Sequence, residues 1–110
     1  MISHRYYYEG DNVLSIIDDI KRDITNQETD ISIESTTMNG VTILNIVNER
    51  FFFRTSSYAS VVMTFVIGDN KIEVLVTSSG AGNGIFNFSW GATTKLYEIW
   101  DKFLVKHKFK

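Results

Sequence analysis

Two stretches of the chain repeat apolar residues at helical spacing. Apolar side chains recur three or four residues apart, which places them on one side of a helix. The first stripe comprises Val13, Ile16, Ile17, Ile20 and Ile24, and the second comprises Ala92, Leu96, Ile99, Trp100, Phe103 and Leu104. Asp11 is the expected N-cap of the first helix, and Thr93 or Thr94 that of the second. Each helix is therefore predicted to lie with one side against another layer.

Outside the two helices, the hydrophobic period falls to two, as in β-strands. The alternation predicts strands over residues 2–8, 31–34, 41–47, 58–67, 71–77 and 85–90. Asn39-Gly40 supplies residues that tolerate positive φ, as a tight hairpin requires. The segment from Arg50 to Arg54 is either a short strand of its own or an extension of a neighbouring strand.

The predicted order is one strand, a helix, four or five consecutive strands, and a second helix. Consecutive strands joined by tight turns favour an antiparallel meander with the helices on one face. We therefore predict a single α+β domain over residues 1–110, with two layers and a sheet of five or six strands. This order resembles the strand–helix–meander–helix arrangement of the TATA-binding-protein-like and helix-grip folds. The sequence has no motif of either family, so no functional residue carries over.

The two faces of the predicted sheet are both apolar. One face carries Ala59, Val61, Met63, Phe65, Ile67, Ile72, Val74 and Val76, enough to receive both helices. The reverse face should alternate cleanly with polar residues if water covers it, and it does not. We expect a second copy of the chain to cover this helix-free face, giving a homodimer. Its predicted contact residues are Val62, Val66, Leu75 and Ile85, with Tyr58 on the same face.

An alternative prediction is a small apolar ligand held between the sheet and the C-terminal helix. The pocket would be lined by Phe86, Phe88, Trp90, Trp100 and Phe103. So many large aromatic side chains in a short chain would tend to fill that space themselves.

Charge and cysteine content narrow the possible partners. The formal net charge of −2 lacks the basic excess typical of nucleic-acid binding. The chain has no cysteine, which excludes disulfides, thiolate nucleophiles and sulfur-ligated zinc and fits a reducing compartment. The N-terminal residues have no apolar core of the kind a secretion signal needs, and the apolar run of residues 58–67 is too short to span a bilayer. A cytoplasmic protein without membrane contact is expected.

The sequence offers few groups for catalysis, and we expect a non-enzymatic protein without a cofactor or metal. Its two histidines, His4 and His107, are far apart and have no partner at ligand spacing. An enzyme would need an unusual constellation, with His4, Tyr6 or Tyr8 as candidates. We expect His107 to interact with a helix C-terminus instead.

Two local motifs remain. Gly80, Gly82 and Gly84 lack the spacing of a dinucleotide-binding fingerprint, and they are expected to form a connecting loop rather than a lid. Between Arg50 and Arg54, an extended chain would place both arginines and Phe52 on one face, as some RNA-binding strands do. The interpretation we favour is two core phenylalanines, Phe51 and Phe53, flanked by solvated arginines.

Overall fold

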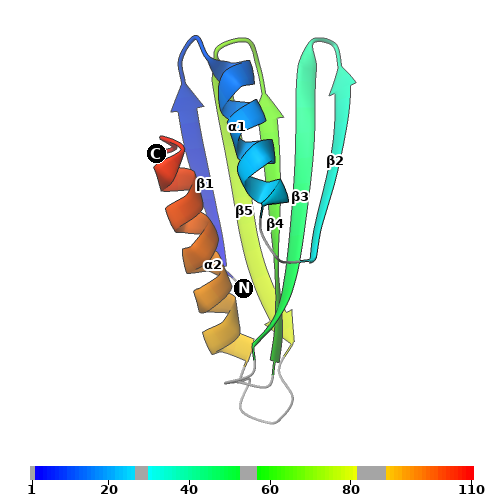
Figure 1. Cartoon of the computed structure of the whole chain (residues 1–110), viewed down its shortest axis with the longest axis vertical. Coiled ribbons are helices and arrows are strands. Elements are labelled where there is room, and N and C mark those ends of the chain that lie inside the picture. The colour runs from blue at the N-terminus through cyan, green and yellow to red at the C-terminus, as the bar shows by residue number, and fades with distance from the viewer. Residues whose placement is uncertain (1, 27–29, 53–56, 82–88) are drawn as a thin grey trace.

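A computed structural model describes residues 2–26, 30–52, 57–81 and 89–110 (Figure 1). The elements in chain order are β1 (Ile2–Glu9), α1 (Val13–Thr25), β2 (Asp30–Met38), β3 (Val41–Phe52), β4 (Ser57–Ile67), β5 (Lys71–Ala81) and α2 (Ser89–Lys106). The strands form one sheet in the order β1-β5-β4-β3-β2, with every neighbouring pair antiparallel. The predicted α+β class and strand–helix–meander–helix order are confirmed, with five strands.

The connection through α1 places β1 and β2 at opposite edges of the sheet. β1 and β2 are the two edge strands, so the chain crosses the sheet by way of α1 before the meander β2-β3-β4-β5 returns it to β1. Both helices lie over the same side of the sheet, with α2 near β1 and α1 nearer its centre (Figure 1). The two helices cover this side only in part, and β2 is exposed at almost every position.

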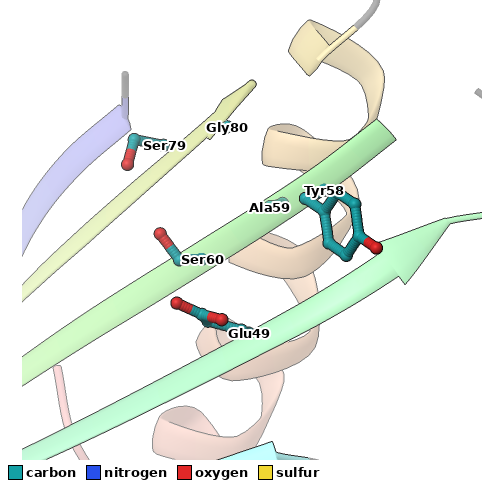
Figure 2. A pocket seen from close by; sticks show the side chains of 6 residues that line it. All are labelled: Glu49, Tyr58, Ala59, Ser60, Ser79 and Gly80. Carbon is teal, nitrogen blue, oxygen red and sulfur yellow. The ribbon is translucent and has the colours of Figure 1, made fainter. Parts of the chain in front are cut away.

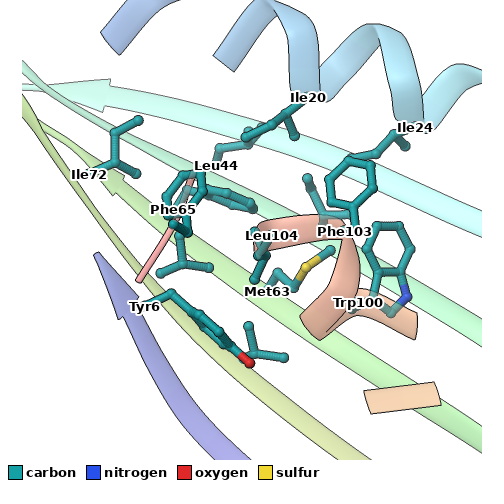
Figure 3. Close-up of a cluster of buried hydrophobic side chains, with 14 of the residues drawn as sticks. Tyr6, Ile20, Ile24, Leu44, Met63, Phe65, Ile72, Trp100, Phe103 and Leu104 are labelled. Carbon is teal, nitrogen blue, oxygen red and sulfur yellow. The ribbon is translucent and has the colours of Figure 1, made fainter. Parts of the chain in front are cut away.

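The hydrophobic core lies between the helices and the sheet (Figure 3). The inward residues of β4 and β5 are fully buried, as are Ile20 of α1 and Leu104 of α2. Asn48 is buried within this apolar layer, where its Oδ1 accepts a hydrogen bond from the Trp100 indole at 3.0 Å and its Nδ2 donates to the Asp30 carbonyl at 3.1 Å. Both ends of the amide have a partner, which removes the penalty for burying it.

The tight hairpin between β2 and β3 forms as expected. Asn39 has φ of 53° and Gly40 has φ of 78°, the pair of positive values that a two-residue turn between twisted strands requires. The segment around Arg50 is settled in favour of an extension, because β3 continues through Phe52. Arg54 and Phe53 lie outside the described residues.

Several predicted boundaries are wrong. The N-cap of α1 is Asn12, without a side-chain capping bond, rather than Asp11. α2 already begins at Ser89, so Thr93 and Thr94 lie inside the helix rather than at its cap. The end of the predicted strand over residues 85–90 is likewise helical, and residues 85–88 lie outside the described residues. β5 extends to Ala81, so Gly80 belongs to a strand rather than to a loop, whereas Gly82 and Gly84 are not described.

The C-terminal residues close one edge of the sheet. The amide of Phe109 donates to the Leu104 carbonyl at 3.0 Å and that of Lys108 to Val105 at 3.0 Å, which is the Schellman pattern of helix termination. Lys108 therefore takes a left-handed φ of 72°, and Phe109 is turned into the core. Lys110 then exchanges two backbone hydrogen bonds of 2.9 Å with Tyr7, which cover part of the free edge of β1.

Candidate functional site

The helix-free face consists of the outward residues of all five strands. Its composition differs from that of a solvated sheet most clearly on β4, the central strand. Val61, Met63 and Phe65 point to the helices and are completely buried, whereas Val62 and Val66 point away and are 38% and 41% exposed. Leu75 of β5 is half-buried on the same side. The structure thus places three of the four predicted contact residues together on one face, and Ile85 lies outside the described residues.

Cross-strand pairing joins these apolar residues into two pairs. Val62 lies directly opposite Val47, and Val66 directly opposite Ile43, which is itself 41% exposed. Directly opposed side chains on one face are close enough to touch. Two apolar rows therefore cross β3 and β4, and we name their members Ile43, Val47, Val62 and Val66 the valine patch.

A polar row lies between the two rows of the valine patch. It runs Arg5, Leu75, Thr64, Asn45 and Glu34 from β1 to β2, as the pairing of each strand with the next shows. At its centre the Thr64 hydroxyl donates to Asn45 Oδ1 at 2.8 Å. This bond gives two polar side chains of the row a hydrogen-bond partner within the chain itself.

The charges of the helix-free face are distributed unevenly, since its β1–β5 side carries Arg5 and Lys71 together with Glu9 and Glu73. On the β1–β5 side, Arg5 forms an ion pair with Glu73, and Lys71 Nζ lies 5.9 Å from the centre of the Tyr7 ring. On the β2–β3 side the charged strand positions of this face are all carboxylates: Asp30, Glu34 and Glu49. Both basic side chains on the described strands of the face therefore lie on one side of the valine patch.

One end of the face is hollowed into an open depression (Figure 2). Glu49, Tyr58, Ser60, Ser79 and Gly80 line it, and Ser60 lies between Glu49 and Ser79 in one row across β3, β4 and β5. The ring of Tyr58 packs on Phe51 with 4.8 Å between ring centres. A carboxylate with two hydroxyls supplies hydrogen-bonding groups, but the described lining holds no histidine, lysine or arginine to activate a nucleophile.

The catalytic candidates of β1 divide into two environments. His4 and Tyr6 are in contact, with ring centres 4.9 Å apart, whereas Tyr8 packs against Phe109 at the other end of the strand. The Tyr6 hydroxyl donates to Asp101 of α2 and also bonds the Tyr97 hydroxyl at 2.7 Å. Because Tyr6 has one proton, which Asp101 accepts, Tyr97 must be the donor in the second bond.

The electrostatics of this cluster oppose a role for Tyr6 as a base. Burial raises the pKa of Tyr6 far above its usual value, and its hydrogen bonds to Asp101 and Tyr97 raise the pKa further. A phenol that holds its proton so firmly cannot serve as a general base near neutral pH. The hydrogen bonds of this cluster link α2 to the edge strand β1.

A second polar cluster joins the two helices. His107 Nε2 lies 2.8 Å from Asp23 Oδ2, and Lys106 Nζ lies 3.4 Å from the same oxygen. The hydrogen bond from His107, together with the Lys106 charge, lowers the pKa of Asp23 despite an opposing contribution from desolvation. The prediction places His107 at a helix C-terminus, and in the structure its side chain contacts Asp23 of α1. In the described ranges, no three His, Asp or Glu residues are grouped as metal ligands.

The space beneath α2, proposed as a ligand pocket, is filled where the structure describes it. Trp100 is completely buried, and its ring packs edge-on against Phe103 with 5.0 Å between centres (Figure 3). Met63 and Leu104 occupy the space beside them (Figure 3). Phe86 and Phe88 lie outside the described residues, and Trp90 lies in the first turn of α2.

Sequence reasoning missed the side-chain partners that hold the layers together. Tyr6 and Asp101 are 95 residues apart, His107 and Asp23 are 84 apart, and Trp100 and Asn48 are 52 apart. Local periodicity has no information about pairs so distant in the chain. The one available signal was Asn48 itself, a polar residue that follows Leu44 and Ile46 at the same period of two.

Comparison with known proteins gives a family whose function is unknown. No curated protein and no solved structure matches the chain. In the described part of the chain, neither helix has the length and apolar character needed to cross a bilayer. A family model described as a family of unknown function, DUF6054, matches residues 1–108. Because this match covers almost the whole sequence, the chain belongs to the DUF6054 family.

Proposed function

We propose that this chain is a non-enzymatic interaction module that forms a homodimer through its helix-free face. The observation that carries the proposal is the valine patch, two apolar pairs that flank the Thr64–Asn45 pair near the centre of a sheet whose other side is partly covered by two helices. Side chains on a solvated face gain nothing from being apolar, whereas a covered face gains from each one.

The size of the face suits a dimer. Five strands about 4.8 Å apart and about nine residues long, at about 3.3 Å per residue, present a surface of about 700 Å². Stable protein–protein interfaces bury about 800 Å² on each partner. The helix-free face is therefore large enough to form one standard interface, provided that most of it is used.

The hydrophobic energy available is of the size that a weak dimer needs. Fully burying a valine, leucine or isoleucine side chain is worth about 1.5–3 kcal/mol, and these side chains are about 40% exposed or less before association. Five such residues on each copy, the valine patch and Leu75, therefore supply a gross gain on the order of 6–12 kcal/mol, comparable with the roughly 8 kcal/mol that a micromolar complex requires. The loss of rigid-body freedom and of side-chain entropy offsets part of this gain.

The charge of the face favours a protein partner over nucleic acid or an anionic membrane. Its described strand positions hold two basic residues, Arg5 and Lys71. They hold five acidic residues, Glu9, Asp30, Glu34, Glu49 and Glu73. A surface with this balance repels phosphate groups. We place the dimer in the cytoplasm, which agrees with the absence of cysteine from the sequence.

Light scattering of two matched variants tests the proposal. Val62→Asp puts a carboxylate at the centre of the valine patch, and we expect it to convert a wild-type dimer to monomer. Leu14→Asp is the control, because Leu14 is 76% exposed on α1 and outside the helix-free face. We expect this control to stay dimeric. A monomeric wild-type chain at micromolar concentration, or equal loss of the dimer in both variants, would contradict the proposal.

A further inference from the structure

The two copies of the proposed dimer can face each other in two simple ways, which the charges of the sheet distinguish. A two-fold axis parallel to the strands lays β4 on β4, β5 on β3 and β1 on β2 of the partner. An axis perpendicular to the strands lays each strand over itself. Both arrangements cover the valine patch, but with different partners. The parallel axis sets Val62 on Val62 and Val66 on Val66, and it places Ile43 opposite Glu73 and Val47 opposite Thr77. The perpendicular axis sets the two apolar pairs on each other, so the parallel axis depends on its charged contacts rather than on hydrophobicity.

The axis parallel to the strands brings opposite charges together. This symmetry operation exchanges the two sides of the sheet but preserves height along the strands. Arg5 and Glu34 occupy the two ends of one row, since Arg5 pairs with Leu75, Leu75 with Thr64, Thr64 with Asn45 and Asn45 with Glu34. Arg5 of each copy therefore faces Glu34 of the other, and the pair occurs twice in the dimer.

The alternative axis lacks this complementarity. It would place β2 over β2 and β1 over β1, so that the carboxylates of Asp30, Glu34 and Glu49 gather on one side of the interface. Like charges brought together at an interface oppose association. On the parallel axis, Glu34 is opposite a guanidinium and Glu49 is opposite Ser79, so neither carboxylate directly opposes another.

We infer that the dimer, if it forms as proposed above, has its two-fold axis parallel to β4 and is oriented by reciprocal Arg5–Glu34 contacts between the copies. This inference rests on the proposed function and specifies its geometry. Arg5 is held in place by Glu73 within its own chain and has further guanidinium N–H groups for a second carboxylate. The twist between packed sheets displaces the edge rows by about 5 Å, a distance that these two long side chains span.

A charge swap between copies tests the orientation. Arg5→Glu gives copies whose interface pairs two carboxylates, and Glu34→Arg gives copies that pair two guanidinium groups. We expect each variant alone to dimerise about tenfold more weakly or worse. In an equimolar mixture, the introduced glutamate of one variant meets the introduced arginine of the other, and the unchanged Arg5 and Glu34 meet at the second contact. The mixture should therefore regain dimer at the wild-type concentration.

The controls separate the orientation from the dimer itself. Asp18→Arg, a reversal on an exposed residue of α1, keeps Arg5 and Glu34 and should dimerise alone like wild type, so that weaker association of the Arg5 and Glu34 variants is not an effect of charge reversal in general. If the wild-type chain is a dimer and the swapped mixture stays dissociated, the orientation is wrong while dimerisation stands. If the wild-type chain is a monomer, the orientation and the proposed function fail together.

A distance measurement supports or contradicts the same geometry without altering the charges. Because the chain has no cysteine, Ser60→Cys accepts a single spin label, and Ser60 lies on β4 towards one end of the face. With the axis parallel to the strands, the two labels lie across the interface from each other. With the perpendicular axis through the valine patch, they lie about 26 Å farther apart along the strands. Only the shorter distance agrees with the inference.

Discussion

Both faces of β4 carry apolar side chains, but one face is buried and the other is partly exposed. Phe65 and Val66 are neighbours in the chain and both are apolar, yet Phe65 is completely buried and Val66 is 41% exposed. Helices from both ends of the sequence cover the first face of β4, and no described element of the chain covers the second. Apolar residues on both faces are typical of a strand that is buried on both sides, and the chain's own helices cover only one side of β4.

The largest difference between the faces should appear in stability. Phe65→Ala should lower the free energy of unfolding by about 3–5 kcal/mol, because it removes a buried ring and leaves a cavity. Val66→Ala on the adjacent position should change it by less than about 1 kcal/mol in the dissociated chain. Urea unfolding in dilute solution measures both. Equal losses of unfolding free energy in the two variants would contradict the proposed difference between the two faces.

Removing one tyrosine hydroxyl from each face of the sheet compares the hydrogen bonds of the two faces. Tyr6→Phe removes the bonds to Asp101 and Tyr97 on the helix-covered face, and we expect a loss of about 1–2 kcal/mol. Tyr7→Phe is the matched control, since Tyr7 is 44% exposed on the helix-free face. Thermal unfolding should place the control within about 0.5 kcal/mol of wild type. A larger loss of stability in Tyr7→Phe than in Tyr6→Phe would show that other contacts hold β1 in place.

The end of α2 offers a change that should stabilise the helix-covered face. Lys108 has a φ of 72°, which costs a residue with a side chain about 1 kcal/mol relative to glycine. Lys108→Gly should therefore raise the free energy of unfolding by about 0.5–1 kcal/mol. Chemical denaturation checks the sign, and a destabilised variant would mean that the lysine side chain makes a contact worth more than the strain.

The smallest effect should come from the ion pair that joins the helices. The pKa of Asp23 is lowered in the folded chain, chiefly by His107, so its contribution to stability is complete above the unfolded pKa of about 4. That contribution is lost as the pH falls through the lower, folded value. Asp23→Asn should make unfolding less dependent on pH below about 4. Melting temperatures across this acidic range check it, with Asp18→Asn as the control, and identical pH profiles for Asp23→Asn and wild type would contradict it.

Much of the fold could be predicted because it depends on local periodicity. The period-two pattern of residues 58–67 and 71–77 indicated which side chains of β4 and β5 share a face, and Asn39-Gly40 indicated the hairpin. The apolar character of the helix-free face followed from Val62, Val66 and Leu75 by the same reasoning. Register is predictable here because a one-residue shift would move every side chain to the other face.

The failures have physical reasons of two kinds. Ser89 and Trp90 follow an alternating run, Ile85-Phe86-Asn87-Phe88, and short alternation does not reveal where a helix begins. Adjacent Asp11 and Asn12 are both good capping residues, so the sequence does not choose between them. The links of Tyr6 to Asp101 and of Asp23 to His107 depend on how the layers meet in space, which no local pattern contains.

Sedimentation equilibrium of the unmodified chain, from submicromolar to high micromolar concentration, tests most directly whether the helix-free face is covered by a second copy. The account predicts a mass that rises from 12.6 kDa to twice that value and then stays constant, as a closed two-fold dimer requires. A mass of 12.6 kDa throughout the range would contradict it.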